Sequence, residues 1–391
     1  MTDRIPDRPG LLYRLFLRRL RTASGGRDGL PLPERVTPEA LASLRRMTGL
    51  PSFPQRLSSF QIRRWSDIAV PGAAGPRKAR LYRPRGRVGG IVLFLHGGGF
   101  VHCDLVSHHG ICCRLARHSG AMVLSLDYRL APEHPFPAAV EDGWEALRWV
   151  FGQARALNLP VAVCGDSAGG NLAAVLARRA RDGAGAHARE NAGEALAAQL
   201  LYYPALTGLW SPRSRIDHAE GYMLTARLLD WYGRQYVQDD RKVIDPDFAP
   251  AFAPSLEGLP PAMIVTAGFD PLRGEGEIYT ALLREAGVEV SLRGFPSAIH
   301  GFLNGYAVLV EGRRALREGG AFLRRRFAAA RAGSLWRSVA EPAAICRTGD
   351  CPPTGVPDGE TRIGAGSPFI AAWRENAPVC PDPSPEADRP G

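Results

Sequence analysis

The sequence contains no uninterrupted apolar stretch long enough to cross a membrane, although 45% of its 391 residues are hydrophobic. A helix that spans a bilayer needs about 20 consecutive apolar residues. The first residues do not form a secretory signal either, because Arg14, Arg18 and Arg19 interrupt the apolar core that such a signal requires. We therefore expect a cytoplasmic protein without a transmembrane anchor.

Cysteine is scarce, and its seven residues show no regular spacing. An odd number without a disulfide framework is typical of a reducing compartment. Cys164 lies in an apolar run, and Cys112 and Cys113 lie in a predicted helix, which favours small buried side chains. The spacing of Cys346 and Cys351 would suit a metal, but no second ligand pair accompanies them, so we predict no metal site.

Motifs for nucleic-acid recognition are also missing, despite a formal net charge of +10. The positive charge comes mainly from arginines near the two ends of the chain. No zinc-finger spacing, aromatic-basic signature or helix-turn-helix pattern accompanies it. Charge alone affects solubility and encounter rather than specific recognition. We therefore expect no nucleic-acid partner.

Residues 11–21 form a predicted basic amphipathic helix. Leu12, Leu15, Phe16 and Leu20 share one stripe of it, with arginines on another. We expect the apolar stripe to pack on the protein and the arginines to face solvent. Peripheral contact with an anionic membrane is the alternative interpretation.

From Gln61 onward, short apolar runs alternate with longer helical patterns. The predicted strands are Trp65–Val70, Arg80–Arg83, Ile91–Leu95, Met122–Leu126, Val161–Cys164, Ala198–Tyr203, Met263–Thr266 and Val288–Arg293. The predicted helices are Ser107–His118, Ala138–Phe151, Ala168–Arg181, Ala226–Tyr236, Gly276–Glu285 and Tyr306–Phe327. This pattern predicts an α/β fold with a mostly parallel sheet covered by helices on both faces. Ligands bind such sheets beyond the carboxyl ends of the strands.

Two segments interrupt the alternation and are predicted to cover that edge of the sheet as a helical cap. They are residues 1–60 and an insertion at 206–254, which is rich in Trp, Tyr, Asp and Pro. The catalytic domain is predicted to span 61–331. Residues 332–391, dense in Pro, Gly and charge from Ala340 onward, are predicted to form a disordered tail.

The strand Val161–Cys164 runs directly into Gly165-Asp-Ser-Ala-Gly169, and a helix follows at once. This is the G-x-S-x-G nucleophile elbow in its strand–turn–helix context. Ser167 is therefore the predicted nucleophile. A serine hydroxyl is a weak nucleophile and needs an adjacent base.

A glycine-rich segment follows the strand Ile91–Leu95, in the sequence His96-Gly-Gly-Gly-Phe100. Consecutive glycines allow the backbone to approach a reacting group closely. We predict that the amides of Gly97, Gly98 and Gly99 form an oxyanion hole with the amide of Ala168. His96 is predicted to be structural. A phosphate-binding loop is disfavoured because the lysine and the following Ser or Thr are missing.

The base and its orienting acid should follow the serine in the chain. His300 is selected because it follows the strand Val288–Arg293 through the loop Gly294–Ile299 and precedes Gly301. Asp270 is the predicted acid because it stands just past the strand Met263–Thr266. Glu275 and Glu277 are expected to be solvated on the next helix. In the predicted reaction, His300 takes the proton of Ser167, and Asp270 orients the imidazole.

Five ordered blocks resemble those of the hormone-sensitive lipase-like branch of the α/β-hydrolases, which includes many bacterial carboxylesterases. They are HGGGF at 96–100, DYRLAPEHPFPAA at 127–139, GDSAGGN at 165–171, LPPAMIVTAGFDPLR at 259–273 and IHGF at 299–302. The resemblance covers about Val88 to Phe302. It implies an α/β-hydrolase fold with an eight-stranded sheet and a cap, no metal or organic cofactor, and hydrolysis of short to medium acyl esters.

The expected partner is thus a small acyl ester, and a homodimer is left open. A deacetylase or amidase acting on an acetylated small molecule is the alternative among hydrolases, because the predicted triad does not separate esters from amides. The alternative from another class is a non-catalytic small-molecule-binding homologue, since plant gibberellin receptors resemble this family but lack a working histidine. The presence of His300 with both partners favours an enzyme.

Overall fold

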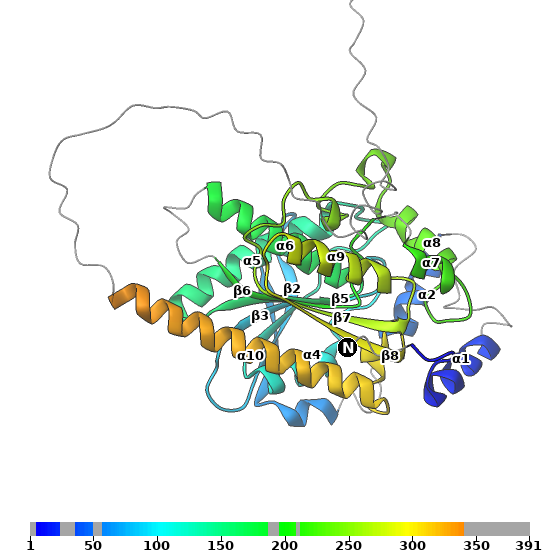
Figure 1. Cartoon of the computed structure of the whole chain (residues 1–391), viewed down its shortest axis with the longest axis horizontal. Helices are drawn as coiled ribbons and strands as arrows, with labels where there is room; N and C mark the ends of the chain where they lie inside the picture. The colour runs from blue at the N-terminus through cyan, green and yellow to red at the C-terminus, as the bar shows by residue number, and fades with distance from the viewer. Residues whose placement is uncertain (1–4, 24–35, 50–56, 187–194, 209–211, 340–391) are drawn as a thin grey trace, which may run out of the picture. The chain divides into compact units, whose positions relative to one another are not determined.

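A sheet of eight strands organises the described part of the chain (Figure 1). The computed structural model describes residues 5–23, 36–49, 57–186, 195–208 and 212–339. The strands are β1 (Arg64–Val70), β2 (Arg77–Arg83), β3 (Ile91–Leu95), β4 (Met122–Leu126), β5 (Val161–Asp166), β6 (Leu196–Tyr202), β7 (Ala262–Phe269) and β8 (Val290–Ile299). Their order in the sheet is β1-β2-β4-β3-β5-β6-β7-β8. The pairs β1/β2 and β2/β4 are antiparallel, and the other pairs are parallel.

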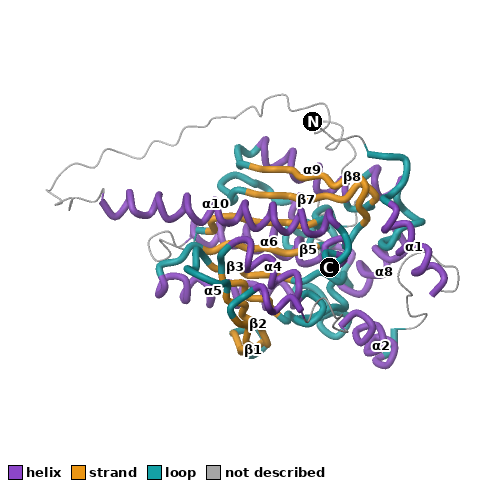
Figure 2. Tube along the Cα trace, turned by 90° about the horizontal axis from the view of Figure 1, so that it is seen from below, coloured by secondary structure: helices purple, strands orange, loops and turns teal. Residues whose placement is uncertain are grey.

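The sheet is buried on both faces because its central strands are apolar on both sides. In β3, Leu93 and Leu95 belong to one hydrophobic core, and Val92 and Phe94 belong to the other. Helices α5 (Ala138–Leu157), α6 (Ala168–Ala186) and α9 (Arg273–Glu285) cover one face, and α4 (His109–Ser119) and α10 (Val310–Val339) cover the other (Figures 1 and 2). The predicted mostly parallel sheet between two helical layers is confirmed.

Strand β8 corrects one prediction, because the segment Gly294–Ile299 is strand and not loop. This segment contains Pro296, which has no backbone N–H to donate. The ladder with β7 shifts register between Ala267 and Phe269, where Phe269 pairs with Ile299, so the proline falls within the irregularity. A proline at a bulge on an edge strand removes no ladder hydrogen bond.

Several shorter helices complete the described residues. They are α1 (Leu11–Ala23), α2 (Pro38–Gly49), α7 (Arg213–Asp217), α8 (Ala226–Tyr236) and the 3₁₀ helices η1 (Ser58–Gln61), η2 (Asp240–Lys242), η3 (Pro250–Phe252) and η4 (Phe302–Gly305). Figure 1 places α1, α2, α7 and α8 together at one side of the sheet. That residues 1–60 and 206–254 form a cap on a catalytic domain of residues 61–331 stays a prediction.

The predicted start of the tail at 332 is wrong, because α10 continues to Val339. Residues 328–339 include four alanines and two arginines, which have high helix propensity. Residues 340–391 lie outside the described residues.

Helix α1 also departs from expectation, because most of the apolar stripe predicted to pack on the protein is exposed. Leu12, Leu15 and Phe16 keep 50%, 50% and 46% of their surface accessible. The helix is held instead by Tyr13, which is 2% exposed, and by Leu17, which packs on the same core as α4 and α10. Among the described helices, none has the length and apolar content that a membrane crossing requires.

Candidate active site

The turn between β5 and α6 presents Ser167 above the end of the sheet. The backbone φ of Ser167 is +55°, and its amide donates to the Tyr202 carbonyl at 2.8 Å. A Cβ on Gly165 would lie 2.1 Å from the Gly169 carbonyl oxygen, and one on Gly169 would lie 2.0 Å from the Leu95 carbonyl oxygen. Only glycine permits such close backbone approach, so both flanking glycines are needed to form the turn.

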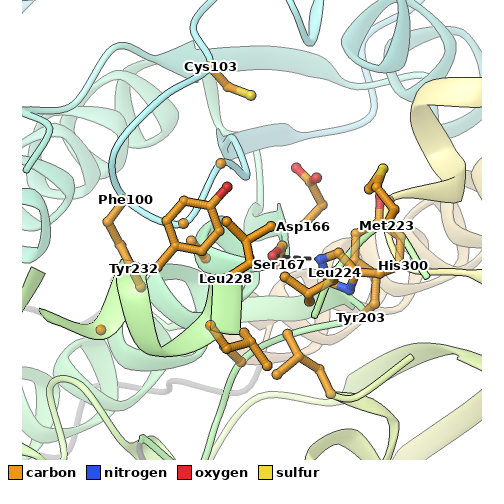
Figure 3. Close-up of a pocket in the computed structure, with 18 of the residues that line it drawn as sticks. Phe100, Cys103, Asp166, Ser167, Tyr203, Met223, Leu224, Leu228, Tyr232 and His300 are labelled. Carbon is orange, nitrogen blue, oxygen red and sulfur yellow. Dashed lines mark hydrogen bonds between the residues drawn. The ribbon is translucent and has the colours of Figure 1, made fainter. Parts of the chain in front are cut away.

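The three residues predicted as a triad lie in hydrogen-bonding contact (Figure 3). His300 Nε2 is 2.9 Å from Ser167 Oγ, and His300 Nδ1 is 2.7 Å from Asp270 Oδ2. The Asp270 side chain is fully buried, and its other oxygen accepts from the Leu272 amide at 2.8 Å. The carboxylate accepts from Nδ1–H, which leaves Nε2 of a neutral imidazole free to accept the serine proton.

Each of the three residues directly follows or ends a parallel strand. Ser167 follows β5, Asp270 follows β7 and His300 follows β8. Parallel strands direct their carboxyl ends to the same edge of the sheet, where ligands bind in such folds. Ser167 therefore meets Asp270 and His300, although both lie more than a hundred positions further along the chain.

The predicted oxyanion hole is corrected at one position. The Gly97 amide donates to Asp166 Oδ1 at 2.9 Å, so it is not free to bind a substrate oxygen. The amides of Gly98, Gly99 and Ala168 have no acceptor among the described residues. These three residues line one pocket with Ser167. The physical reason is that Gly97 binds the buried carboxylate that directly precedes the serine.

Asp166 is a functional candidate that the sequence reasoning missed, and it fixes the position of the glycine-rich loop. It is 2% exposed and lies 3.2 Å from His108 Nε2. Burial raises the pKa of Asp166, but the nearby His108 and the Gly97 amide outweigh burial and lower it. Asp166 stands within the pentapeptide at a position that the motif leaves open, so the sequence held no signal for its role.

The structural role predicted for His96 fits its surroundings. His96 Nδ1 donates to the Gly97 carbonyl at 2.8 Å, and the ring stacks on Tyr128. Burial and the neighbouring His108 lower the pKa of His96 to about 4, which keeps the ring neutral near pH 7. Tyr128 in turn donates to the His96 carbonyl at 2.6 Å.

The pocket beside Ser167 is small and mostly apolar, with a volume of about 130 Å³. Leu228 and Tyr232 of α8 line this pocket together with Ser167 and His300 (Figure 3). The apolar lining comprises Phe100, Leu224, Leu228, Leu229, Tyr232 and Phe248. The Tyr232 hydroxyl is 2.6 Å from His102 Nε2, which ties α8 to the glycine-rich loop.

Glu275 corrects the expectation of a solvated side chain, because it is 1% exposed and lines the pocket. One of its oxygens, Oε2, accepts from the amides of Leu206 and Thr207 at 2.6 and 2.9 Å. The carboxylate thereby holds the backbone that leaves β6. Burial raises the pKa of Glu275 to about 7, although the two amides and Arg215 favour the ionised form. Glu277, by contrast, is partly exposed and pairs with Arg273.

Replacing Glu275 with glutamine tests this buried carboxyl. Because its folded pKa is raised above the ordinary 4.5, the protonated form stabilises the fold at low pH, and this stability is lost as pH rises to about 7. The Glu275→Gln variant can keep both amide hydrogen bonds on one oxygen and has no such titration. We expect urea unfolding at pH 4.5 and 8 to show the wild type losing about 3 kcal/mol relative to the variant. Equal pH dependence of the two proteins would contradict the burial argument.

The described residues contain no group of three or more His, Cys, Asp or Glu side chains that could hold a metal ion. Four described cysteines are free thiols: Cys103, Cys112, Cys113 and Cys164. The last three are buried, as predicted. Cys346, Cys351 and Cys380 lie outside the described residues.

Comparison with known protein families places this geometry in context. The family described as "alpha/beta hydrolase fold" matches residues 92–304, more than half of the chain. This range contains all the residues of the candidate site.

Curated relatives and solved structures agree with that match. Carboxylic ester hydrolase LipN of Mycobacterium tuberculosis is 47% identical over 247 residues, which cover 61% of this chain and 64% of that protein, just under two thirds of its length. Esterase LipI of the same organism is 38% identical over 72% of this chain and 87% of its own length. An esterase structure from Pyrobaculum calidifontis superposes with a TM-score of 0.70 at 39% identity, covering 81% of this chain and 98% of that one.

Proposed function

The chain belongs to the α/β-hydrolase family, in the hormone-sensitive lipase-like branch, and on this basis we propose that it hydrolyses carboxylic esters of short to medium acyl chains. The observation that carries the proposal is the pair of contacts from His300 to Ser167 and Asp270. Relatives named as esterases support the same reaction class. The whole set of reacting groups comes from this chain.

In the proposed reaction, Ser167 Oγ attacks the acyl carbonyl as His300 Nε2 takes the hydroxyl proton. The carbonyl carbon becomes tetrahedral, and its oxygen gains negative charge. His300 then gives the proton to the departing alcohol, which leaves the acyl group on Ser167. Water repeats the sequence and releases the acid. Asp270 keeps the Nδ1–H tautomer and stabilises the imidazolium that forms in each half.

The oxyanion of each tetrahedral intermediate is bound by backbone amides. We assign this role to Gly98, Gly99 and Ala168, because their N–H groups have no acceptor in the part of the chain that the structure describes and the three residues border the serine. Ala168 is the first residue of α6, so the partial positive charge at that helix end adds to the stabilisation. Gly97 has an indirect part, since its bond to Asp166 positions the loop.

A non-catalytic binding role is disfavoured because the triad is complete and hydrogen-bonded. An amidase or deacetylase would use the same triad, and the relatives' names favour esters. The cytoplasmic location and a homodimer stay predictions from the sequence.

A series of p-nitrophenyl esters of increasing chain length tests the proposed function. We expect high kcat/KM from acetate to hexanoate and a decline for longer chains, because the pocket that Leu228, Leu229 and Phe248 line has a volume of only about 130 Å³. A preference for very long chains would instead indicate a lipase. Hydrolysis of p-nitroacetanilide but not of the matching acetate ester would favour the amidase alternative.

Replacing Gly99 with alanine tests the oxyanion loop. Gly99 has a φ of +58°, and a Cβ there would lie 2.3 Å from the Tyr232 ring, which His102 holds by a hydrogen bond. The loop must therefore shift, and we expect kcat for p-nitrophenyl butyrate to fall by about 100-fold. Gly120→Ala is the matched control, since Gly120 has a φ of +67° with no atom within 4 Å of the added Cβ. Wild-type kcat in Gly99→Ala would refute the assigned role.

A further inference from the structure

Helix α1 exposes an apolar sector that no described residue covers. Leu11, Leu12, Leu15 and Phe16 are 46–62% exposed, although such side chains normally pack inside. The helix is not loosely attached, because Tyr13 is buried on its opposite side and the Gly10 amide donates to the Ser297 carbonyl at 3.2 Å. Helix α1 is therefore attached to the rest of the protein and exposes four large apolar side chains to solvent.

Positive charge lies beside this apolar sector. The helix carries Arg14, Arg18, Arg19 and Arg21 and no acidic residue. The neighbouring acids are Asp7, which precedes the helix, and Glu311, which lies near Tyr13. Helical spacing places Arg14 and Arg18 next to the edge formed by Leu11 and Leu15. Arginine side chains can lay their apolar stems along such a sector and reach polar headgroups with the guanidinium.

The exposed sector borders a groove that leads to the reacting groups. Leu12, Leu15 and Phe16 form one wall of this groove, whose volume is about 950 Å³, with Arg18 and Arg19 also on it. Met223 and His300 line both this groove and the pocket that holds Ser167. Val308, which is 66% exposed, lies on the groove as well. Figure 1 places α1 next to β8, the strand that His300 follows.

We propose that the exposed sector of α1, with its arginines, docks the protein on membranes that contain anionic lipids. Docking buries the four apolar side chains among acyl chains and pairs the arginines with headgroups. Docking also turns the groove toward the bilayer, so that an ester dissolved in the membrane has a short route to Ser167. The substrate class that we infer, esters that partition into membranes, rests on the proposed function. The docking itself can be measured without catalysis.

Sedimentation of the full chain with vesicles tests the proposal. We expect binding to phosphatidylcholine vesicles that contain phosphatidylglycerol, weaker binding to phosphatidylcholine alone, and loss of the difference at high salt. Combined replacement of Leu12, Leu15 and Phe16 by serine should lower the partition coefficient about tenfold on both vesicle types. Combined replacement of Arg14, Arg18 and Arg19 by glutamine should lower it about tenfold on the anionic vesicles only.

Matched controls lie on α5, which is away from α1 in Figures 1 and 2. Leu157 is 55% exposed and the Arg148 side chain 59%, so Leu157→Ser and Arg148→Gln should leave vesicle binding unchanged. Thermal melting shows whether each variant folds, and the serine and glutamine sets are independent of each other.

Three results would overturn the proposal. They are no sedimentation of the wild type with anionic vesicles, sedimentation that neither set of α1 substitutions reduces, and a dimer in solution that the serine set dissociates without any vesicle binding. Hydrolysis of p-nitrophenyl butyrate by the wild type in the absence of vesicles tests the proposed function separately. A protein that hydrolyses this ester but ignores vesicles would refute only the docking.

Discussion

The Ser167→Ala variant is expected to hydrolyse p-nitrophenyl butyrate with a kcat lowered by about five to six orders of magnitude. The hydroxyl that His300 contacts at 2.9 Å is the group that forms the acyl-enzyme. A water molecule in its place is not held in position and cannot form the covalent intermediate. Stability should change little, since alanine and serine tolerate the +55° φ of this turn about equally. Steady-state kinetics on the purified variant, with melting temperature as the check on folding, measures the effect.

The combined Ser167→Ala and His300→Ala variant provides the accompanying test. Residues that act as one unit lose their effect together, so the double variant should be no more than about threefold slower than Ser167→Ala. If the loss of kcat in the double variant equalled the product of the losses in the two single variants, the two residues would act independently. If the kcat of Ser167→Ala, corrected for contaminating wild-type protein, stayed above one hundredth of the wild-type value, Ser167 would not be the nucleophile.

The Asp270→Asn variant is expected to lower kcat by about four orders of magnitude. The Asp270 carboxylate accepts from both His300 Nδ1 and the Leu272 amide, whereas asparagine has only one side-chain oxygen. An amide NH₂ facing Nδ1 would favour the wrong imidazole tautomer, with the proton on Nε2. The KM should change by less than about threefold, because Asp270 does not line the substrate pocket.

Asp239→Asn is the matched control for that prediction. Asp239 lies in the 206–254 segment, and its side chain bonds to the largely exposed Arg241. The same loss of a carboxylate there should leave kcat within about twofold of wild type. If the two substitutions had similar effects, the special role of Asp270 would be refuted.

The sequence was sufficient to locate the reacting side chains because each directly follows or ends an apolar strand. The chain order Ser167, Asp270, His300 and the common edge of a parallel sheet left few other partners. The helix and strand interiors were predictable for the same reason, since β3 is apolar throughout and β4 is apolar at every position except Ser125. The end of β8 was not, because Pro296 resembles a strand terminator and only its place in the irregular ladder makes it tolerable.

The supporting contacts could not be predicted because they depend on the three-dimensional arrangement. Asp166 takes the Gly97 amide only when β3 and β5 lie side by side, which removes one of three equivalent glycines from the oxyanion hole. Glu275 follows Asp270 closely and looks like a solvated helix residue, yet it turns toward the backbone that leaves β6. Helical periodicity found the apolar stripe of α1 but could not show that Tyr13 would be the buried anchor.

Covalent labelling with a serine-directed reagent shows directly whether Ser167 is the activated nucleophile. A sulfonyl fluoride should transfer its sulfonyl group to Ser167 Oγ with loss of fluoride and the serine proton. We expect one adduct per chain, located by peptide mass spectrometry at residue 167, with activity lost in parallel and no adduct in Asp270→Asn on the same timescale. Inactivation with the adduct on another residue, or full labelling of Ser167 with activity retained, would contradict the role of Ser167 as nucleophile.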